Sequence, residues 1–79
     1  MDKINKFLLK LSEKERAIYF KIFADISSLN LQNYDVKALK GYKGVCRLRK
    51  GNVRIVFLKQ NEKGILINIA YRKDSYKNL

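Results

Sequence analysis

Apolar side chains recur along this chain with two different periods, and the period changes near residue 40. Residues 2–11 follow helical spacing, and a second, broader helical stripe continues to Ser27-Ser28. Between them, Ser12 and Glu15 fit a capping box at the start of a helix. The pattern therefore predicts two helices that meet at Ser12. The apolar residues of the two stripes are Ile4, Phe7, Leu8, Leu11, Ala17, Ile18, Phe20, Ile22, Phe23 and Ile26.

The second half of the chain alternates apolar and polar residues, which is typical of half-buried β-strands. Two turns, at residues 50–52 and 61–64, divide this half, and Gly51 suits the positive φ that the first turn needs. The strands that the alternation predicts span residues 45–49, 53–59 and 65–72. Residues 29–37 are expected to form a loop. A helical turn or an extended piece at residues 36–39 is one alternative, and an extended edge strand from residues 30–36 is another.

Short turns make neighbouring strands antiparallel, and the helices should cover the apolar face of the sheet. The expected fold class is therefore α+β: an N-terminal helical hairpin packed on a small antiparallel sheet of three main strands. Residues 1–79 are expected to form a single domain. In the last strand, one face should carry Ile65, Ile67, Ile69 and Tyr71, and the other Leu66, Asn68, Ala70 and Arg72.

Arginines alternate with apolar residues in the first two predicted strands. Because successive side chains of a strand point to opposite faces, Arg47, Arg49 and Arg54 should share the uncovered face. The apolar residues that should point the other way are Cys46, Leu48, Val53, Ile55 and Phe57. If both hairpins are regular, Asn68 and Arg72 join the arginines. The residues expected at the edge of this face are Lys40, Tyr42 and Lys43, with Tyr76 just beyond the last strand.

Charge strengthens the case for an anionic partner. Eighteen Lys and Arg residues against seven Asp and Glu residues give a formal net charge of +11. Between Asp25 and Asp74 the chain carries only two acids, Asp35 and Glu62. A cationic sheet face interleaved with tyrosines is typical of binding to a phosphate backbone and unstacked bases. Charge alone leaves RNA, DNA, an anionic membrane and an acidic protein as admissible partners.

Several functional classes are excluded by composition. The chain has no His and one Cys, so Cys/His zinc sites and His-based catalysis are ruled out, and no Gly-rich phosphate loop is present. We expect no metal and no cofactor. Cys46 is interpreted as a small core residue. No apolar run could span a membrane and no signal peptide is visible, so a cytoplasmic protein without a membrane partner is expected. Arginines are poor general bases, so these residues alone support binding more strongly than catalysis.

The order of these residues resembles the RelE/ParE superfamily of toxins from bacterial type II toxin–antitoxin systems. The likeness is carried by Leu39-Lys40-Gly41-Tyr42, by residues 47–57, by Tyr71-Arg72 and by Tyr76-Lys77. It runs from about residue 39 to residue 79, and the two helices ahead of it also match in order. Members usually begin with a β-strand, for which Met1-Asp2-Lys3 leaves no room, so that strand is expected to be missing.

The resemblance to the RelE branch implies a metal-independent endoribonuclease that cleaves messenger RNA in the ribosomal A site by attack of the 2′-OH. By position, Arg47 and Arg49 match a basic pair near the scissile phosphate, and Arg54 matches the arginine that holds its developing charge. Arg72 matches an arginine implicated in proton donation, and Tyr76 a tyrosine that orients a base. The RNA-binding residues that we expect around this set are Lys40, Tyr42, Lys43, Lys50, Asn68, Lys73 and Lys77.

The resemblance leaves alternatives open. Members often have lysines where this chain has Arg47 and Arg49, so the general base is unassigned, with Tyr76 as a candidate. The ParE branch poisons DNA gyrase on the same fold, and an inactive relative that binds RNA or protein is a further alternative. The partners implied are a cognate antitoxin, the ribosome and messenger RNA, and the toxin alone is expected to be monomeric.

Overall fold

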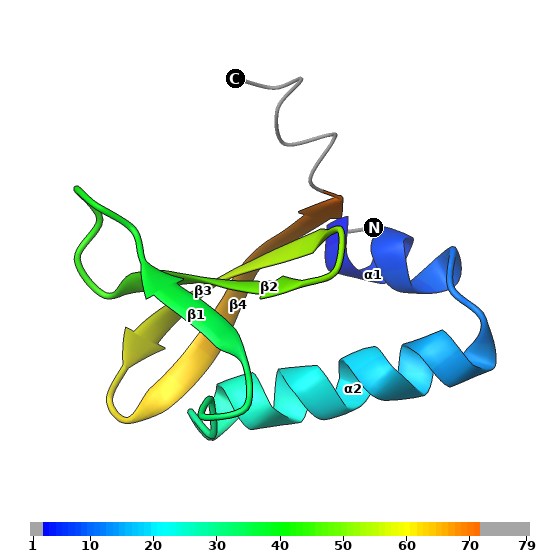
Figure 1. The fold of residues 1–79 in the computed structure, drawn as a ribbon, viewed down its shortest axis with the longest axis horizontal. Coiled ribbons are helices and arrows are strands. Elements are labelled where there is room, and N and C mark those ends of the chain that lie inside the picture. Colours follow the sequence, from blue (N-terminus) through cyan, green and yellow to red (C-terminus); the bar gives the residue numbers. More distant parts are fainter. Residues whose placement is uncertain (1–2, 72–79) are drawn as a thin grey trace.

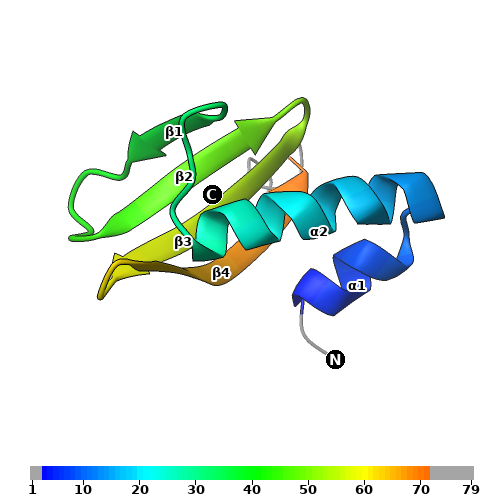
Figure 2. The same ribbon diagram turned by 90° about the horizontal axis from the view of Figure 1, so that it is seen from below.

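The computed structural model describes residues 3–71, which form two helices followed by a four-stranded sheet (Figure 1). The elements are α1 (Lys3–Leu9), α2 (Glu13–Ser27), β1 (Asp35–Ala38), β2 (Val45–Lys50), β3 (Val53–Gln60) and β4 (Lys63–Tyr71). All strand pairs are antiparallel in the order β1-β2-β3-β4, and both helices lie on one side of the sheet (Figure 2). The α+β class is confirmed. Beyond the three main strands, the extended piece considered at residues 36–39 forms a short fourth strand, β1.

The capping box predicted at Ser12 is present and starts α2. The Ser12 hydroxyl accepts a hydrogen bond from the Glu15 N–H at 3.3 Å, and the Glu15 carboxylate accepts one from the Ser12 N–H at 3.1 Å. These bonds satisfy backbone donors that a helix start otherwise leaves without partners. The helix ends at Ser27, where the Ser28 N–H donates to the Ala24 carbonyl at 3.1 Å. Neither helix of the described residues is long and apolar enough to cross a membrane.

The core lies between the helices and the sheet, and every buried side chain of residues 3–71 is apolar. The most deeply buried are Phe57, Ile26, Leu48 and Ile55. Cys46 is a buried, free cysteine in this core, which confirms its interpretation as a small core residue. The broad stripe predicted for α2 is only partly in the core, because Ile18 and Phe20 are 47% and 55% exposed. Both helices pack mainly on β4, so α2 buries only the side that faces this strand, and Ile18 and Phe20 lie outside that contact on different sides of the helix.

The turn between β3 and β4 is tighter than predicted. Asn61 and Glu62 both have positive φ, of 53° and 64°, which a two-residue hairpin turn of type I′ requires. β4 therefore begins at Lys63, and Gly64 is a strand residue rather than a turn residue. A Cβ at Gly64 would lie 2.1 Å from the Ile26 carbonyl oxygen. Glycine is needed here because the end of α2 presses directly on β4.

A β-bulge in the β3–β4 pair changes which residues of β4 face the core. Val56 pairs with Asn68 but Phe57 pairs with Leu66, so Ile67 has no partner on β3. The strict alternation predicted for β4 is wrong for this reason: one extra residue shifts the faces of the strand. Leu66 packs on the core, whereas Ile65 pairs with Leu58 on the other face and is 47% exposed.

A polar link connects α2 to the segment that leads into β1. The Asp25 carboxylate accepts hydrogen bonds from the Tyr34 hydroxyl and from the Lys21 ammonium, the latter at 3.0 Å. The bond from Tyr34, and after it the bond from Lys21, holds the pKa of Asp25 below its ordinary value. The Tyr34 ring also packs against the core. This link holds the edge strand near the helix.

Replacing Gly64 should destabilise the protein. We expect Gly64→Ala to lower the free energy of unfolding by about 1–3 kcal/mol, as overpacking does, measured by urea denaturation. The closest atom is a backbone oxygen, so the additional substitution Ile26→Val should not restore stability. Full recovery in the double variant would contradict the close approach of α2 to β4.

Removing the Tyr34 hydroxyl should have a pH-dependent effect. Because the folded-state pKa of Asp25 is lowered, its contribution is present above the unfolded pKa of about 3.9 and is lost as pH falls through the folded value. Tyr34→Phe should therefore unfold at lower temperature than the parent protein near neutral pH. The two melting temperatures, followed by circular dichroism, should converge as the solution is acidified below pH 3.9. A constant difference at every pH would refute this link.

Candidate functional site

The sheet face away from the helices, which we call the outer face, carries the predicted arginines. In β2 and β3, Cys46 pairs with Phe57 and Leu48 with Ile55 on the helix side. The intervening residues must point the opposite way. The outer face is therefore formed by Asp35, Lys37, Val45, Arg47, Arg49, Arg54, Val56, Leu58, Gln60, Lys63, Ile65, Asn68 and Ala70. Three of the predicted catalytic residues, Arg47, Arg49 and Arg54, share this face, together with Asn68.

Arg49 and Arg54 are direct cross-strand partners. Like charges opposite each other destabilise a sheet, and a shared anion converts the repulsion into two charge-assisted contacts. Ala70 continues this row on β4, where its small side chain leaves the arginines room. The pair sits next to the two-residue turn at Gly51-Asn52, at one end of the sheet. This row brings two arginines into direct opposition on the outer face, and the neighbouring row adds Lys37 and Arg47.

The next row along the strands places Arg47, Val56 and Asn68 side by side. Arg47 and Asn68 are half-buried residues, but Nε and Nη2 of Arg47 and Oδ1 of Asn68 are themselves shielded from solvent and have no hydrogen-bond partner among residues 3–71. Nε and Nη2 form one edge of the guanidinium, which can donate two parallel hydrogen bonds to a phosphate or carboxylate. Buried polar groups without partners cost about 1–3 kcal/mol each, a cost that an oxyanion between these residues would remove on the arginine side.

Asp35 was not expected at the site. Pairing of β1 with β2 places it opposite Arg49, at the end of the row that holds Arg49 and Arg54. Within residues 3–71, Asp35 is the one acidic residue whose strand position lies on the outer face. The alternation of Asp35 and Lys37 was visible in the sequence, but their neighbours depend on a strand pairing that crosses a six-residue loop. Asp35 tempers the positive field beside Arg49.

A third row, of Val45, Leu58 and Ile65, is apolar, and beyond it Gln60 pairs with Lys63. The arginines thus lie toward one end of the outer face, and the apolar row lies between them and Lys63. Such a face can hold phosphate groups at the arginines and less polar groups, such as a base, at the apolar row.

Other predicted site residues lie elsewhere. Lys50 points to the helix side of the sheet, because it pairs with the buried Val53. The loop that joins β1 to β2, at the opposite end of β2 from Arg49, carries Lys40, Tyr42 and Lys43, all exposed. Four predictions fall outside the described residues: Arg72, Lys73, Tyr76 and Lys77. No cluster of His, Cys, Asp and Glu that could hold a metal occurs within residues 3–71.

Comparison with known proteins supports the fold. No protein-family model and no curated protein sequence matches this chain. Among solved structures, it is similar to a chain in the crystal structure of the RelB–RelE antitoxin–toxin complex from Methanococcus jannaschii, with a TM-score of 0.66 and 28% sequence identity. The similarity covers 90% of this chain and 87% of that one. The likeness confirms a RelE-like fold for this protein.

The outer face should bind inorganic phosphate. Phosphate at ten times its Kd should stabilise the folded protein by about 1.4 kcal/mol, and the melting temperature should rise above that in NaCl of equal ionic strength. Arg47→Gln should reduce this rise, whereas Asp35→Asn should increase it by removing the acid beside Arg49. The matched control is Lys10→Gln, at an exposed residue in the short connection from α1 to α2. An unchanged rise in Arg47→Gln would exclude Arg47 from the phosphate site.

Proposed function

We propose that this protein is the toxin of a type II toxin–antitoxin system and that it cleaves messenger RNA on the ribosome. The observation that carries the proposal is the adjacent pair Arg49 and Arg54, beside Arg47, on the outer face of a RelE-like fold. The similar solved structure is an antitoxin–toxin complex, which supports an antitoxin as partner. A net charge of +11 favours association with ribosomal and messenger RNA, with strong dependence on salt.

The chemistry needs no metal. The 2′-oxygen of one nucleotide attacks the adjacent phosphorus, its proton passes to a base, and the bond from phosphorus to the 5′-oxygen breaks. The products are a 2′,3′-cyclic phosphate and a 5′-OH end, once the leaving oxygen has taken a proton. Arg49 and Arg54 would stabilise the charge that develops on the phosphate oxygens, and Arg47 would hold the same or a neighbouring phosphate.

The residues that transfer protons are assigned through the family resemblance. Arginines keep their protons, so Arg47 and Arg49 serve as charge stabilisers rather than as bases. The roles of Arg72 as proton donor and Tyr76 in orienting a base remain proposals carried by the family resemblance. Alignment of the message by the ribosome would supply part of the rate, because the geometry of in-line attack is itself a large part of the barrier.

Arg54→Ala should abolish toxicity while leaving the fold intact. Loss of one preorganised donor to a developing charge should slow cleavage about 10²–10³-fold. The measurements are growth after induced expression, and mapping of new 5′-OH ends within translated messages. Lys10→Ala, an exposed change remote from the outer face, is the control and should remain toxic. Circular dichroism should show equal folding of all three proteins.

Two outcomes would refute the nuclease. If Arg54→Ala cleaves messages as fast as the parent protein, the outer face is not the active site. If growth arrest comes with DNA-damage signalling and intact messages, the protein acts as a ParE-like gyrase poison instead. RNA binding without message cleavage and without DNA-damage signalling would identify an inactive RNA-binding relative.

A further inference from the structure

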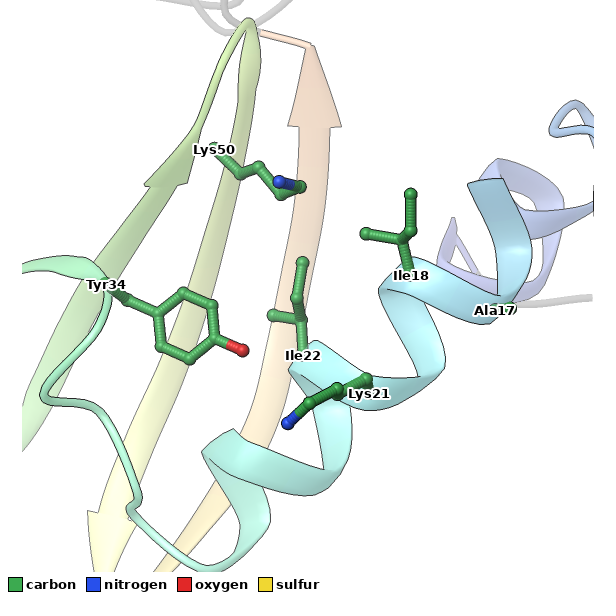
Figure 3. Close-up of a pocket in the computed structure, with 6 residues that line it drawn as sticks. All are labelled: Ala17, Ile18, Lys21, Ile22, Tyr34 and Lys50. Carbon is green, nitrogen blue, oxygen red and sulfur yellow. The ribbon is translucent and has the colours of Figure 1, made fainter. Parts of the chain in front are cut away.

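A second surface feature lies on the opposite side of the sheet from the arginines. A hollow of about 330 Å³ opens between α2 and the β1–β2 side of the sheet (Figure 3). It exists because both helices pack mainly on β4, so α2 does not cover the β1–β2 side. The hollow is lined by Ala17, Ile18, Lys21, Ile22, Tyr34 and Lys50.

The lining of the hollow is mostly apolar. Ile18 and Ile22 project from α2 toward the sheet, and the Tyr34 ring faces them from the segment before β1 (Figure 3). Ile18 is 47% exposed although it lies at this concave surface. The volume is near the lower end of the range of about 300–1,000 Å³ found for small-molecule pockets, so one or two bulky apolar side chains would fill it.

The two ends of the rim of the hollow differ in charge. At one end, Lys21 is already paired with Asp25, whose carboxylate also accepts the Tyr34 hydroxyl. At the other end, Lys50 extends toward α2 (Figure 3) and its ammonium makes no hydrogen bond or ion pair within residues 3–71. An occupant with a negative charge would therefore place it at Lys50 and away from Asp25.

We propose that this hollow receives a segment of a protein partner, in which a bulky apolar side chain is followed by acidic residues. This inference rests on the proposed function for the identity of the partner, the antitoxin. The apolar side chain would lie between Ile18, Ile22 and Tyr34, and the first acid would pair with Lys50. RNA fits less well, because unstacked bases prefer aromatic or guanidinium surfaces, and the one aromatic ring in the lining, that of Tyr34, faces aliphatic side chains of α2 and packs against the core.

The position of Lys50 links this hollow to the outer face. Lys50 neighbours Arg49 in β2, but the two side chains point to opposite faces of the sheet. Only the two-residue turn Gly51-Asn52 separates Lys50 from β3, at the end of the sheet where Arg49 and Arg54 pair. A partner segment anchored in the hollow could therefore pass around this turn and bring its further acids onto Arg49 and Arg54. Docking on one face would then block phosphate binding on the other.

The first test looks for a small reading frame that adjoins this gene and measures, by titration calorimetry, the affinity of its product for full-length variants of this protein. Ile18→Asp and Lys50→Glu should each weaken binding at least tenfold. Matched controls make the same changes elsewhere: Leu9→Asp, at a residue 63% exposed, and Lys10→Glu. The controls should bind within twofold of the parent protein. Equal affinity of all five proteins would overturn the docking site.

A second test examines the hollow without the partner. Titration with 3-phenylpropionate, followed by ¹⁵N NMR, should shift the amide signals of Ile18, Ile22, Tyr34 and Lys50. The neutral 3-phenylpropan-1-ol should bind several-fold more weakly, and Lys50→Glu should abolish the difference between the two probes. Because these probes do not reach around the turn, they should leave binding of phosphate to the outer face unchanged. Absence of these shifts would overturn the proposal.

The two tests separate failure of the inference from failure of the proposed function. If the neighbouring gene product does not bind the parent protein, the antitoxin assignment fails, and the 3-phenylpropionate titration alone decides whether the hollow takes an acidic apolar group. If the same four signals shift when the protein is concentrated alone, the occupant is a second copy of this chain. If they shift with an RNA oligonucleotide, the hollow belongs to RNA binding. Either result would refute docking of a partner protein.

Discussion

The antiparallel pairing of β2 with β3 is the interaction on which the rest of this structure depends. It buries Cys46, Leu48, Ile55 and Phe57 on one side and thereby forces Arg47, Arg49 and Arg54 to the other. A slip of one residue would place the arginines in the core, which no available partner could compensate. Core packing and the position of the cationic residues are thus one constraint, and the arginine face is as well determined as the core itself.

This arrangement leaves locally unfavourable electrostatic and hydrogen-bonding interactions in the folded state. Arg49 opposes Arg54, and Arg47 has buried donors without partners within the described residues. Unfavourable local contacts of this kind are retained where function uses them and are offset by the rest of the fold. Here the offset comes from an entirely apolar core and a fully capped α2. An anion on the outer face would relieve the repulsion, so binding and stability are coupled at this site.

The helices cover the β4 side of the sheet more than the β1–β2 side, and this unevenness shapes a second surface. Close approach of α2 to β4, which Gly64 permits, draws the helix layer to one edge and leaves space beside β1 and β2. Tyr34 partly closes this space through its bond to Asp25, and Lys50 reaches into what remains. The two functional surfaces proposed for this protein therefore lie on opposite faces of one hairpin, and they meet at its turn.

Local sequence determined the elements and much of the candidate site. Helical spacing and the Ser12–Glu15 box predicted α1 and α2, and alternation predicted β2, β3, β4 and the shared face of Arg47, Arg49 and Arg54, because these signals act between residues close in sequence. Three features came only with the tertiary structure: the bulge that exposes Ile65, the placement of Asp35 opposite Arg49, and the hollow at Lys50. Each depends on how separate segments pair or pack. The bulge is set by a register shift, Asp35 by pairing across a loop, and the hollow by the edge of the sheet that α2 covers, and none of these leaves a periodic signal in the chain.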